Sequence, residues 1–475
     1  MKLARLSVLS EGDIRRIHEA TLEILEGTGV KIGSSRMFAF LQEKGLGVDL
    51  ENQVVRFSRA CIEEALSRIP PVFNVFNREG AFAFVIGNGA SKIAAGHNAV
   101  FWVDSDTGQT RPSTVADVEL FARICEELPA IDMIGIPVMP QDVADPTTTL
   151  LHGVRACVAN SRKPIFFSTD RPEINRAVIE MLRAVYRGDM REEVYGISQL
   201  SPTSPLFWEG SVLDAIMDTV ETGVPLAILP EPNAGISAPY TLAGLLTVNN
   251  AECLSGLAMI QLLKPGAKVV YANSWTTTDM RNGYALVGST ETTICRIAGA
   301  QLARFYEVPS HTTAPNSDNH AHDEQNAWEK ALSQFCSVAA GNDLIVNCGM
   351  FATGMTCSHE QLIMDEEMSA MSRRIAEGIR VNDATIAKDL IMDLGPHNPA
   401  YLTSLHTLEW LHSDEYILPR ISVRGPRAIW EAAGAKDTYQ LARESVRAWA
   451  RKPPRGSLDA QRAGQLEEVV RGFKA

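Results

Sequence analysis

Apolar and polar positions follow two different periods along the first hundred residues of this chain. Residues 10–68 repeat apolar side chains at helical spacing, as Ile14, Ile17, Leu22 and Leu25 do, and they contain one strand-like run. The pattern predicts helices at 10–27, 35–44 and 58–68 and a strand at 51–57. Shorter apolar runs then alternate with Gly-Asn turns and predict antiparallel strands at 72–76, 81–86, 92–95 and 99–103.

From about residue 113 the chain alternates strand-like and helical patterns in a regular order. A helix at 113–127 leads to seven units, each an apolar strand followed by a helix. The predicted strands are 131–139, 164–168, 194–200, 225–229, 268–273, 309–313 and 344–349. The predicted helices after them are 147–160, 173–187, 211–222, 240–264, 290–306, 323–340 and 358–378.

Strands that alternate with helices imply a parallel sheet, and seven units favour a (β/α)8 barrel over an open doubly wound sheet. We place the eighth strand near Pro399–Leu405. No GxGxxG follows the first strand and no P-loop motif occurs, which argues against dinucleotide and P-loop folds. We therefore predict an α/β fold: an N-terminal extension of helices and antiparallel strands at 1–110, a TIM barrel at 111–420, and a C-terminal helical tail at 421–475.

Composition and charge narrow the class of protein. The 475 residues are 45% hydrophobic and 21% charged, which is typical of globular proteins, and the net charge of -13 disfavours binding to nucleic acid. The most apolar long stretch, 241–263, is interrupted by Asn249, Asn250 and Glu252, so no membrane span is expected. The eight Cys form no CxxC pair, and no apolar run typical of a signal peptide follows the first residues. These features predict a cytoplasmic protein with reduced thiols.

The stretch 309–329 is the strongest candidate for chemistry. It begins as a strand, ends in a helix start, and carries between them a crowd of polar side chains: Asp318, Asn319, His320, His322, Asp323, Glu324, Gln325 and Asn326. Strand carboxyl ends and helix amino ends open into the same crevice in α/β proteins. The carboxylates and amides could serve simply as helix caps, but caps do not require imidazoles. We therefore predict Asp318, His320 and His322 as catalytic residues.

The other predicted strand ends are rich in hydroxyl, amide, Met and aromatic side chains and poor in Lys. Only Arg281 brings a permanent positive charge, which argues against a phosphorylated substrate. Aromatic faces such as Phe207, Trp275 and Phe351, with a carboxylate nearby, would suit a quaternary ammonium group, which cannot donate N–H hydrogen bonds. Each aromatic taken alone is more often a core residue.

Two other functions remain open at this point. His320 and His322, with Asp318 and Asp323, could hold a metal ion for a barrel hydrolase, joined by Cys348 or Cys357. An HxH pair alone is a weak motif, and HExxH is absent. The third possibility is a binding protein for betaines that catalyses nothing.

Several segments, in order and spacing over roughly residues 10–420, resemble the trimethylamine methyltransferase family, in its branch without pyrrolysine. They are Ser204-Pro205-Leu206, Asp279-Met280-Arg281-Asn282-Gly283, Glu291-Thr292, Gln301-Leu302-Ala303-Arg304-Phe305-Tyr306, Asp323-x-Gln325, Glu329-Lys330-Ala331-Leu332-Ser333 and Gly354-Met355-Thr356-x-Ser358-x-Glu360-Gln361-Leu362.

The resemblance implies a TIM barrel that moves a methyl group from a methylated amine to the cobalt of a separate corrinoid protein. Members without pyrrolysine are similar to glycine betaine methyltransferase and its relatives for proline betaine, carnitine and other quaternary amines. The sequence contains only standard residues, so the role of pyrrolysine has no occupant. On the family resemblance, glycine betaine, giving dimethylglycine, is the expected methyl donor. We expect cobalamin carried by a partner protein, no tightly bound metal, and a homo-oligomer with the N-terminal helices as plausible contacts.

We assign roles within this expectation from position at the strand ends. Asp318, His320, His322 and Trp275 are predicted at the ammonium and methyl-donor end. The side chains predicted to bind the rest of the substrate are Arg281, Asn273 and Asn319 for the carboxylate, and Phe351 and Phe207 as aromatic walls.

Overall fold

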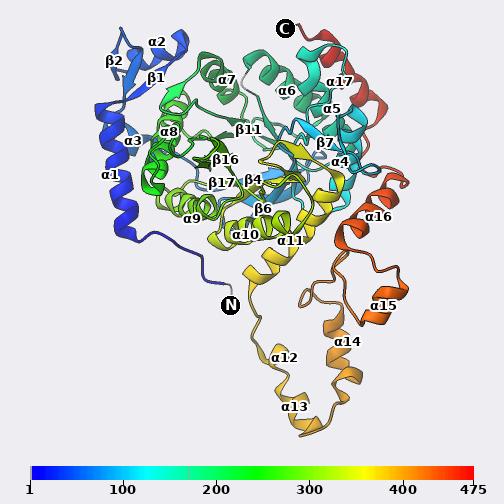
Figure 1. The fold of residues 1–475 in the computed structure, drawn as a ribbon. Coiled ribbons are helices and arrows are strands. Elements are labelled where there is room, and N and C mark those ends of the chain that lie inside the picture. Colours follow the sequence, from blue (N-terminus) through cyan, green and yellow to red (C-terminus); the bar gives the residue numbers. More distant parts are fainter. Residues whose placement is uncertain (1–2, 170, 475) are drawn as a thin grey trace.

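The computed structural model of the protein describes residues 3–169 and 171–474 and is built around a closed barrel of eight parallel strands (Figure 1). Neighbouring strands pair in parallel throughout. In chain order the strands are β6 (Lys92–Ala95), β9 (Met133–Ile134), β10 (Ile165–Ser168), β11 (Gly196–Leu200), β13 (Leu226–Ile228), β14 (Val269–Asn273), β17 (Ser310–Thr313) and β18 (Leu344–Cys348). The predicted TIM barrel is confirmed.

The eighth strand is β6, and its predicted position near Pro399–Leu405 was wrong. β6 lies between β18 and β9, with Ile93 paired to Ile345, whereas residues Ala400–Thr403 form an exposed 3-10 helix, η2. A four-residue apolar run carries no sign of whether its neighbours run parallel or antiparallel, so β6 was grouped with the antiparallel strands before it. The domain boundaries at residues 110 and 420 stay a prediction, and the barrel takes β6 from the first of those ranges.

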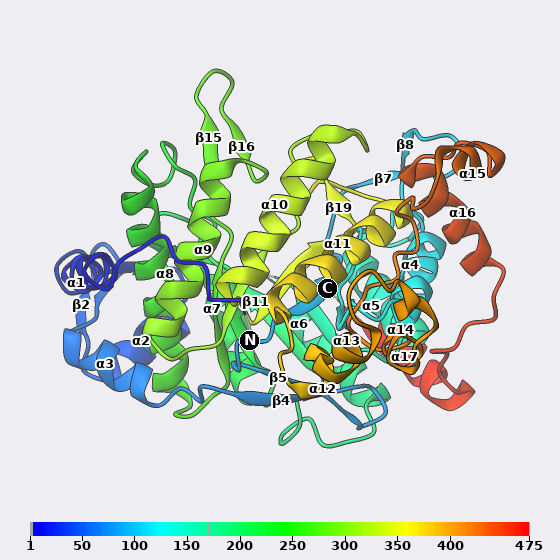
Figure 2. The same cartoon turned by 90° about the horizontal axis from the view of Figure 1, so that it is seen from below.

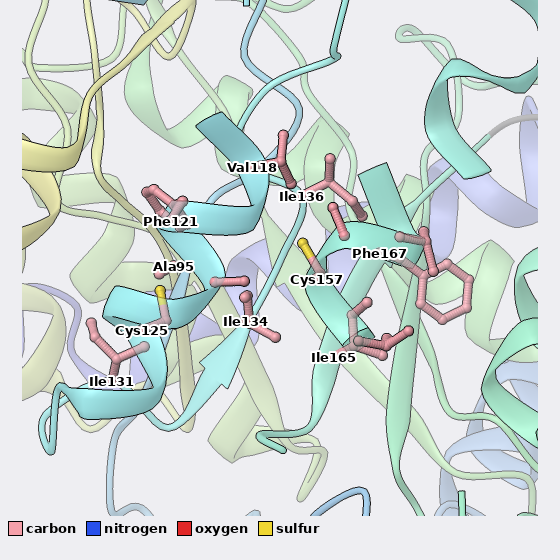
Figure 3. Packing of buried hydrophobic residues seen from close by; sticks show 14 of the residues in the cluster. Ala95, Val118, Phe121, Cys125, Ile131, Ile134, Ile136, Cys157, Ile165 and Phe167 are labelled. Carbon is pink, nitrogen blue, oxygen red and sulfur yellow. The ribbon is translucent and has the colours of Figure 1, made fainter. Parts of the chain in front are cut away.

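The helices predicted after the strands form the outer layer of the barrel. They are α4 (Val115–Glu127), α5 (Thr149–Asn160), α6 (Pro172–Val185), α7 (Gly210–Val220), α8 (Leu242–Leu263), α9 (Thr290–Phe305), α10 (Glu324–Ala340) and α11 (His359–Glu377). Figure 3 shows how this layer packs: Phe121 and Cys125 of α4 and Cys157 of α5 meet Ile134 of β9 and the outward side chains of β10. Each large apolar side chain buried here contributes about 1.5–3 kcal/mol to folding.

The N-terminal segment packs on the outside of α8. Helices α1 (Glu11–Gly27) and α3 (Arg59–Ser67) cover α8, and α2 (Ser35–Glu43) packs on α7. A small sheet lies beside them, ordered β12 (Phe207–Trp208), β1 (Val30–Ile32), β3 (Val54–Arg56), β2 (Gly47–Asp49). The cover explains why α8 is apolar on all sides, since both of its faces are buried. No helix within residues 3–169 and 171–474 has both the length and the apolar character needed to cross a bilayer.

The barrel interior is apolar at its amino end. The hairpin of β4 (Phe73–Phe76) and β5 (Phe82–Ile86) lies under that end, where Val75 bridges to Val194. The side chains gathered inside are Phe73, Val75, Phe84, Ile86, Ala94, Met133, Phe166, Val194, Ile197, Ala227, Leu229, Val270, Ala272, Leu344 and Val346. The carboxyl end is therefore the end available for chemistry, as in other TIM barrels.

After α11 the chain leaves the barrel and later returns to it. The outward path contains α12 (Asp383–Ile386), α13 (Lys388–Leu394), η2 and α14 (Leu405–Leu411). The return passes through α15 (Arg427–Ala432) to α16 (Thr438–Ala450), which packs on α11, and α17 (Ala460–Gly472), which packs on α6. Figure 1 shows the outward path, in orange, standing well clear of the barrel.

Candidate active site

Asp318 joins three loops at the carboxyl end of the barrel. Its carboxylate accepts hydrogen bonds from the backbone N–H groups of Val287 (2.9 Å) and Gly288 (3.0 Å) and from the Thr353 hydroxyl (3.2 Å). Burial raises the pKa of Asp318, and the nearby Glu329 carboxylate adds to that effect. The cap of α10 is Asp323, whose side chain accepts from the N–H groups of residues 325 and 326. Asp318 is thus free of the capping role and holds the loop after β17 against the loops before α9 and after β19 (Met350–Phe351).

His322 lies in an aromatic stack outside the barrel strands. Its ring packs on Phe351, with ring centres 4.6 Å apart, and stacks on Tyr439 of α16 at 4.7 Å, and its Nε2 lies 3.2 Å from the Ser358 hydroxyl. Burial lowers the pKa of His322 to about 4, so the ring is neutral at pH 7. It lines a cavity of about 620 Å³ among α10, α11 and α16, and Met368 lines the same cavity.

The remaining residues predicted around His322 divide into two groups. Asn319 lies in the same loop. Its side-chain amide donates to the Asp323 carboxylate, and its backbone carbonyl accepts from the N–H of Ala352. His320 is exposed to solvent. The structure therefore brings Asp318, Asn319, His322 and Phe351 into one pair of loops and leaves His320 at their surface.

Asn273 and Trp275 face the helix layer and not the barrel axis. The Asn273 amide donates to the carbonyl of His311 (3.0 Å) and accepts from the Thr312 hydroxyl (2.7 Å). Trp275 is buried, and a Cβ at Gly299 of α9 would come within 2.8 Å of its ring and 2.5 Å of the Asn273 amide. Glycine in α9 thus makes room for both side chains, and both serve to pack α9 on β14.

Arg281 and Phe207 lie apart from the other predicted site residues. Arg281 stands at the tip of the hairpin of β15 (Thr277–Asp279) and β16 (Tyr284–Leu286), which projects beyond the barrel in Figure 2. Its side chain is 89% exposed and pairs with Asp279 at 2.8 Å. Phe207 belongs to the small N-terminal sheet, where the Lys31 ammonium lies 5.7 Å from the centre of its ring.

Three rings that the sequence analysis missed meet inside the barrel. His311 of β17 and His97, which follows β6, both contact the Phe166 ring of β10, at centroid distances of 5.2 and 5.6 Å. His97 Nδ1 lies 3.1 Å from the side-chain oxygen of Asn347, whereas neither ring nitrogen of the fully buried His311 has a hydrogen-bond partner in the structure as described. Burial lowers the pKa of His97 to about 4 and holds that of His311 well below its usual value. Both imidazoles are neutral at pH 7.

Glu231 is a second acidic residue at this end of the barrel. It stands three residues after the end of β13, in an irregular segment between Pro230 and Pro232. Its side chain is accessible to solvent, yet desolvation by the surrounding protein raises its pKa to about 7. Its place in the loop directly after a predicted barrel strand was the sequence signal that could have identified it.

Two buried cations fix the loops around this end of the barrel. The Arg296 guanidinium donates to the carbonyls of Thr313 (2.6 Å) and Val287 (2.7 Å). The Lys330 ammonium donates to the carbonyls of Pro315 (3.0 Å) and Met350 and pairs with the buried Asp365 at 3.1 Å. Because these cations bind backbone carbonyls after β17 and before α9 and β20 (Thr356–Cys357), they set the positions of the loops themselves.

No group of three or more His, Cys, Asp or Glu side chains within residues 3–169 and 171–474 is placed to hold a metal ion. The eight cysteines carry free thiols. Burial raises the pKa of Cys348 and of Cys357 well above the usual value, so both are protonated at neutral pH.

The sequence comparisons with known proteins point to one family, and a structural comparison points to the same fold. The family described as trimethylamine methyltransferase (MTTB) matches residues 1–474. A trimethylamine methyltransferase of Desulfitobacterium hafniense is 31% identical over 443 residues, which cover 93% of this chain and 88% of that protein. A glycine betaine methyltransferase of another strain of that species is 28% identical over 451 residues, covering 94% and 92%. The crystal structure of the Methanosarcina barkeri monomethylamine methyltransferase superposes with a TM-score of 0.50 at 13% identity, over 100% of this chain and 97% of that one, and so shares the fold.

Proposed function

Because the chain belongs to the trimethylamine methyltransferase family, we propose that it transfers a methyl group from a quaternary amine to the Co(I) of a corrinoid protein. The family membership and the TIM barrel support methyl transfer as the class of reaction. The choice of donor and the identity of the acceptor belong to the proposal. The corrinoid enters as a second substrate carried by its own protein.

Glu231 is the observation on which the choice of a cationic donor rests. A carboxyl with a pKa near 7 ionises readily when a cation binds beside it, because the opposite charge favours the charged form. The rings of His97, His311 and Phe166 add polarisable surface without adding positive charge at pH 7. A carboxylate and uncharged rings at the carboxyl end of one barrel match what a quaternary ammonium group needs, since that group has no N–H to donate.

The chemistry asks little of the protein beyond binding and orientation. A quaternary nitrogen already carries a positive charge. When the C–N bond breaks, its electron pair returns to nitrogen and a neutral tertiary amine departs, so no proton moves and no general acid is needed. The electron pair for the new methyl–cobalt bond comes from Co(I), a strong nucleophile supplied by the second substrate. The barrel then has to hold the donor and aim one methyl group outward, which is a positioning task.

We propose glycine betaine as the donor, with dimethylglycine as product. The full-length similarity to a glycine betaine methyltransferase supports this choice. The absence of any residue outside the standard set supports a quaternary donor over trimethylamine, for which the family resemblance implies pyrrolysine. Proline betaine and carnitine, which share the trimethylated or dimethylated nitrogen and a carboxylate, are the alternative donors. The predicted roles of Asp318, His320 and His322 remain part of the proposal, as do those of the other loop residues.

We propose that the corrinoid protein docks on an apolar rim beside Glu231. The rim consists of Ile236 and Tyr240, from the loop after β13, and Met280 and Tyr284, from the β15–β16 hairpin, all of which are exposed. The two segments are joined, because the Thr278 hydroxyl donates to Asn233 and to the carbonyl of Ala234. A Cβ at Gly235 would touch both Tyr240 and Met280, so these side chains also lie together. An apolar surface at the carboxyl end of the barrel suits a protein that must bring its cofactor to the donor.

The first experiment is a methylation assay with free cob(I)alamin as acceptor. The donors are glycine betaine, proline betaine, carnitine, choline and trimethylamine, and the loss of cob(I)alamin absorbance is followed. We expect loss with glycine betaine and formation of dimethylglycine in equal amount. Loss with another quaternary amine would correct the donor and keep the reaction class. Loss with trimethylamine alone would contradict the quaternary proposal, and binding of betaine with no transfer to either free or protein-bound corrinoid would leave only a binding protein.

A further inference from the structure

His97 stands at the carboxyl end of the barrel, two residues after β6 ends at Ala95. Its ring contacts the Phe166 ring inside the barrel, with 5.6 Å between the ring centres. In the closed order of eight strands, β6 and β13 lie on opposite sides, so the loop that carries Glu231 begins across the barrel end from His97. Both residues therefore belong to the end of the barrel where we place the donor.

A chain of hydrogen bonds fixes the side-chain amides behind His97. The amide N–H of Asn316 donates to the backbone carbonyl of Thr313 (3.0 Å), an oxygen that can only accept. The side-chain oxygen of Asn316 is therefore the atom that meets the Asn347 amide, which donates to it at 2.9 Å. Because the Asn347 nitrogen is used there, its side-chain oxygen is the atom that lies 3.1 Å from His97 Nδ1. The orientation of each amide thus follows from the one before it.

This chain determines which nitrogen of His97 carries the proton. The Asn347 oxygen can only accept, so Nδ1 is the donor and holds the ring proton. Burial lowers the pKa of His97 to about 4, and the neutral ring at pH 7 has a single N–H. Nε2 therefore has a free lone pair. It has no hydrogen-bond partner within residues 3–169 and 171–474 and, unlike the buried nitrogens of His311, it is accessible to solvent.

The backbone at Asn347 is strained. Its φ is +123°, a conformation that residues other than glycine rarely adopt. Asn347 lies at a bulge between Val346 and Cys348, where β18 shifts its register against β6. Strain of this kind persists where the surrounding structure fixes a residue, and it is concentrated at functional sites. The position of the Asn347 side chain is therefore a feature that the fold maintains against a local penalty.

We propose that His97 Nε2 accepts a hydrogen bond from the N–H of a protonated tertiary amine and thereby distinguishes that ammonium ion from a quaternary one. The inference rests on the proposed function, in which the barrel converts a quaternary amine into a tertiary one. A quaternary donor offers this nitrogen only C–H groups, which are weak hydrogen-bond donors. The protonated product offers an N–H that carries positive charge, and such hydrogen bonds are among the stronger ones. His97 is therefore a positioning residue for the product.

The proton on the product comes from water. The amine departs with its electron pair on nitrogen and takes a proton from a water molecule, which leaves hydroxide, because an alkyl amine is protonated at pH 7. His97 does not supply this proton, since its ring N–H is on Nδ1 and is held by Asn347. Nε2 only accepts, and so it binds the product after the methyl group has gone.

The test compares two ammonium ions that differ by one N–H. Trimethylammonium carries an N–H, and tetramethylammonium has a methyl group in its place. Calorimetric titration of the full chain at pH 7 with each salt measures the two dissociation constants. We expect wild type to bind trimethylammonium at least about tenfold more tightly, because a hydrogen bond from a charged donor replaces a C–H contact.

The variant His97→Phe keeps a ring against Phe166 and removes both ring nitrogens. It should bind tetramethylammonium as wild type does and should lose the preference for trimethylammonium. The matched control is His412→Phe, at an exposed histidine directly after α14, which should keep the wild-type preference. Circular dichroism checks that each variant is folded.

The variant Asn347→Gly tests the hydrogen-bond chain without changing His97. Glycine adopts a positive φ readily, and its missing side chain leaves Nδ1 without an acceptor. Nitrogen-15 NMR of protein labelled at its 10 His residues distinguishes protonated from unprotonated ring nitrogens, and the His97 signals are those that His97→Phe lacks. In wild type Nε2 should be unprotonated and should shift with trimethylammonium and not with tetramethylammonium. In Asn347→Gly the ring proton should be shared between both nitrogens.

Binding and turnover together separate this inference from the proposed function. The role of His97 is overturned if wild type binds neither ion, binds both equally, or shows a preference that survives in His97→Phe. A preference that depends on His97, without methyl transfer from any donor, would overturn the proposed function alone. Where transfer occurs, dimethylglycine should inhibit wild type at least about tenfold more strongly than His97→Phe, and the two proteins should share the same KM for glycine betaine.

Discussion

Glu231 is the side chain whose removal tests the proposed chemistry most directly. Replacing it with Gln keeps its size and removes its charge. We expect kcat/KM for the quaternary donor to fall about 30- to 100-fold, because a desolvated carboxylate–cation contact is worth about 2 to 3 kcal/mol. The loss should appear mainly in KM, since the carboxylate binds the cation before and during transfer. Steady-state kinetics with free cob(I)alamin measure it, and unchanged kinetics would remove Glu231 from the site.

The same carboxyl predicts a pH dependence of donor binding. The pKa of Glu231 is raised to about 7, so the group is neutral below that pH and charged above it. A cation binds the charged form, and therefore its affinity should rise between pH 6 and pH 8 and then level off. The carboxylate of glycine betaine stays ionised throughout this range. Calorimetric titrations of wild type and Glu231→Gln separate the cause: the rise should disappear in the variant, and a rise that persists would assign it to another group.

The sequence analysis chose the candidate site because many polar side chains lie close together at residues 318–326. Such a cluster identifies a loop more reliably than it identifies the side chains that face the barrel axis. The predicted loop does lie at the carboxyl end, and Asp318 and His322 are buried or half-buried there. Glu231 lies between two prolines, and His311 lies in the strand that begins the stretch 309–329, before its polar crowd, so crowding pointed to neither. The inward position of His311 follows from strand alternation, which needs the strand bounds to within one residue. Arg281 was chosen for its permanent charge, but nothing in the local sequence indicates that it lies at the exposed tip of a hairpin.

Between α10 and α11, the buried pair Lys330–Asp365 makes the loops around the site depend on the helix layer. Replacing Lys330 with Met leaves the Asp365 charge buried without its cation. We expect the free energy of unfolding to fall by about 3–5 kcal/mol. Adding Asp365→Asn removes that charge and keeps an acceptor for the Gly349 N–H, so part of the loss should return. Urea denaturation of wild type, Lys330→Met, Asp365→Asn and the double variant gives the coupling free energy between the two side chains. A double variant no more stable than Lys330→Met would contradict the electrostatic explanation.

The buried Glu252 carboxyl of helix α8 predicts that the free energy of unfolding depends on pH. Burial raises the pKa of Glu252 to about 7 from 4.5, although its carboxyl accepts from the Ser204 hydroxyl and the Leu206 N–H. The pKa of this acid is raised in the folded state, so its contribution to stability is present below pH 4.5 and is lost as the pH rises through 7. Wild type should therefore lose about 2 to 3 kcal/mol relative to Glu252→Gln between pH 5 and pH 8. Parallel denaturation curves at the two pH values measure the difference, and a constant difference would show that the pKa of Glu252 is the same in the folded and unfolded states.

The periodicity of apolar and polar positions was enough to predict the helices and strands, but it was not enough to predict which strands pair with each other. Seven strand–helix units determined the barrel, because each unit is long and its two periods are clear. β6 is four residues long and has no helix directly after it, so nothing local marked it as a barrel strand. The segment near Pro399 was chosen in its place because the count required one more strand. Where an element lies in a closed barrel depends on neighbours distant in sequence, and that information is absent from any window of apolar and polar positions.

At the scale of the whole molecule, the apolar rim at the carboxyl end is the surface that we propose for docking of the corrinoid protein. The rim proposal predicts that Met280→Glu combined with Tyr284→Glu weakens docking of the corrinoid protein. Turnover with that protein should show KM for the acceptor raised at least about tenfold, because exposed apolar contacts are replaced by charge. Turnover with free cob(I)alamin should be unchanged, since Glu231 and the rings of His97, His311 and Phe166 are untouched. The matched control is Leu50→Glu, at an exposed leucine in the turn between β2 and β3, which should leave the acceptor KM at the wild-type value. If both acceptors are affected equally, the rim belongs to the donor site; if the control raises the acceptor KM as much as the rim variant does, the rim is not the docking surface.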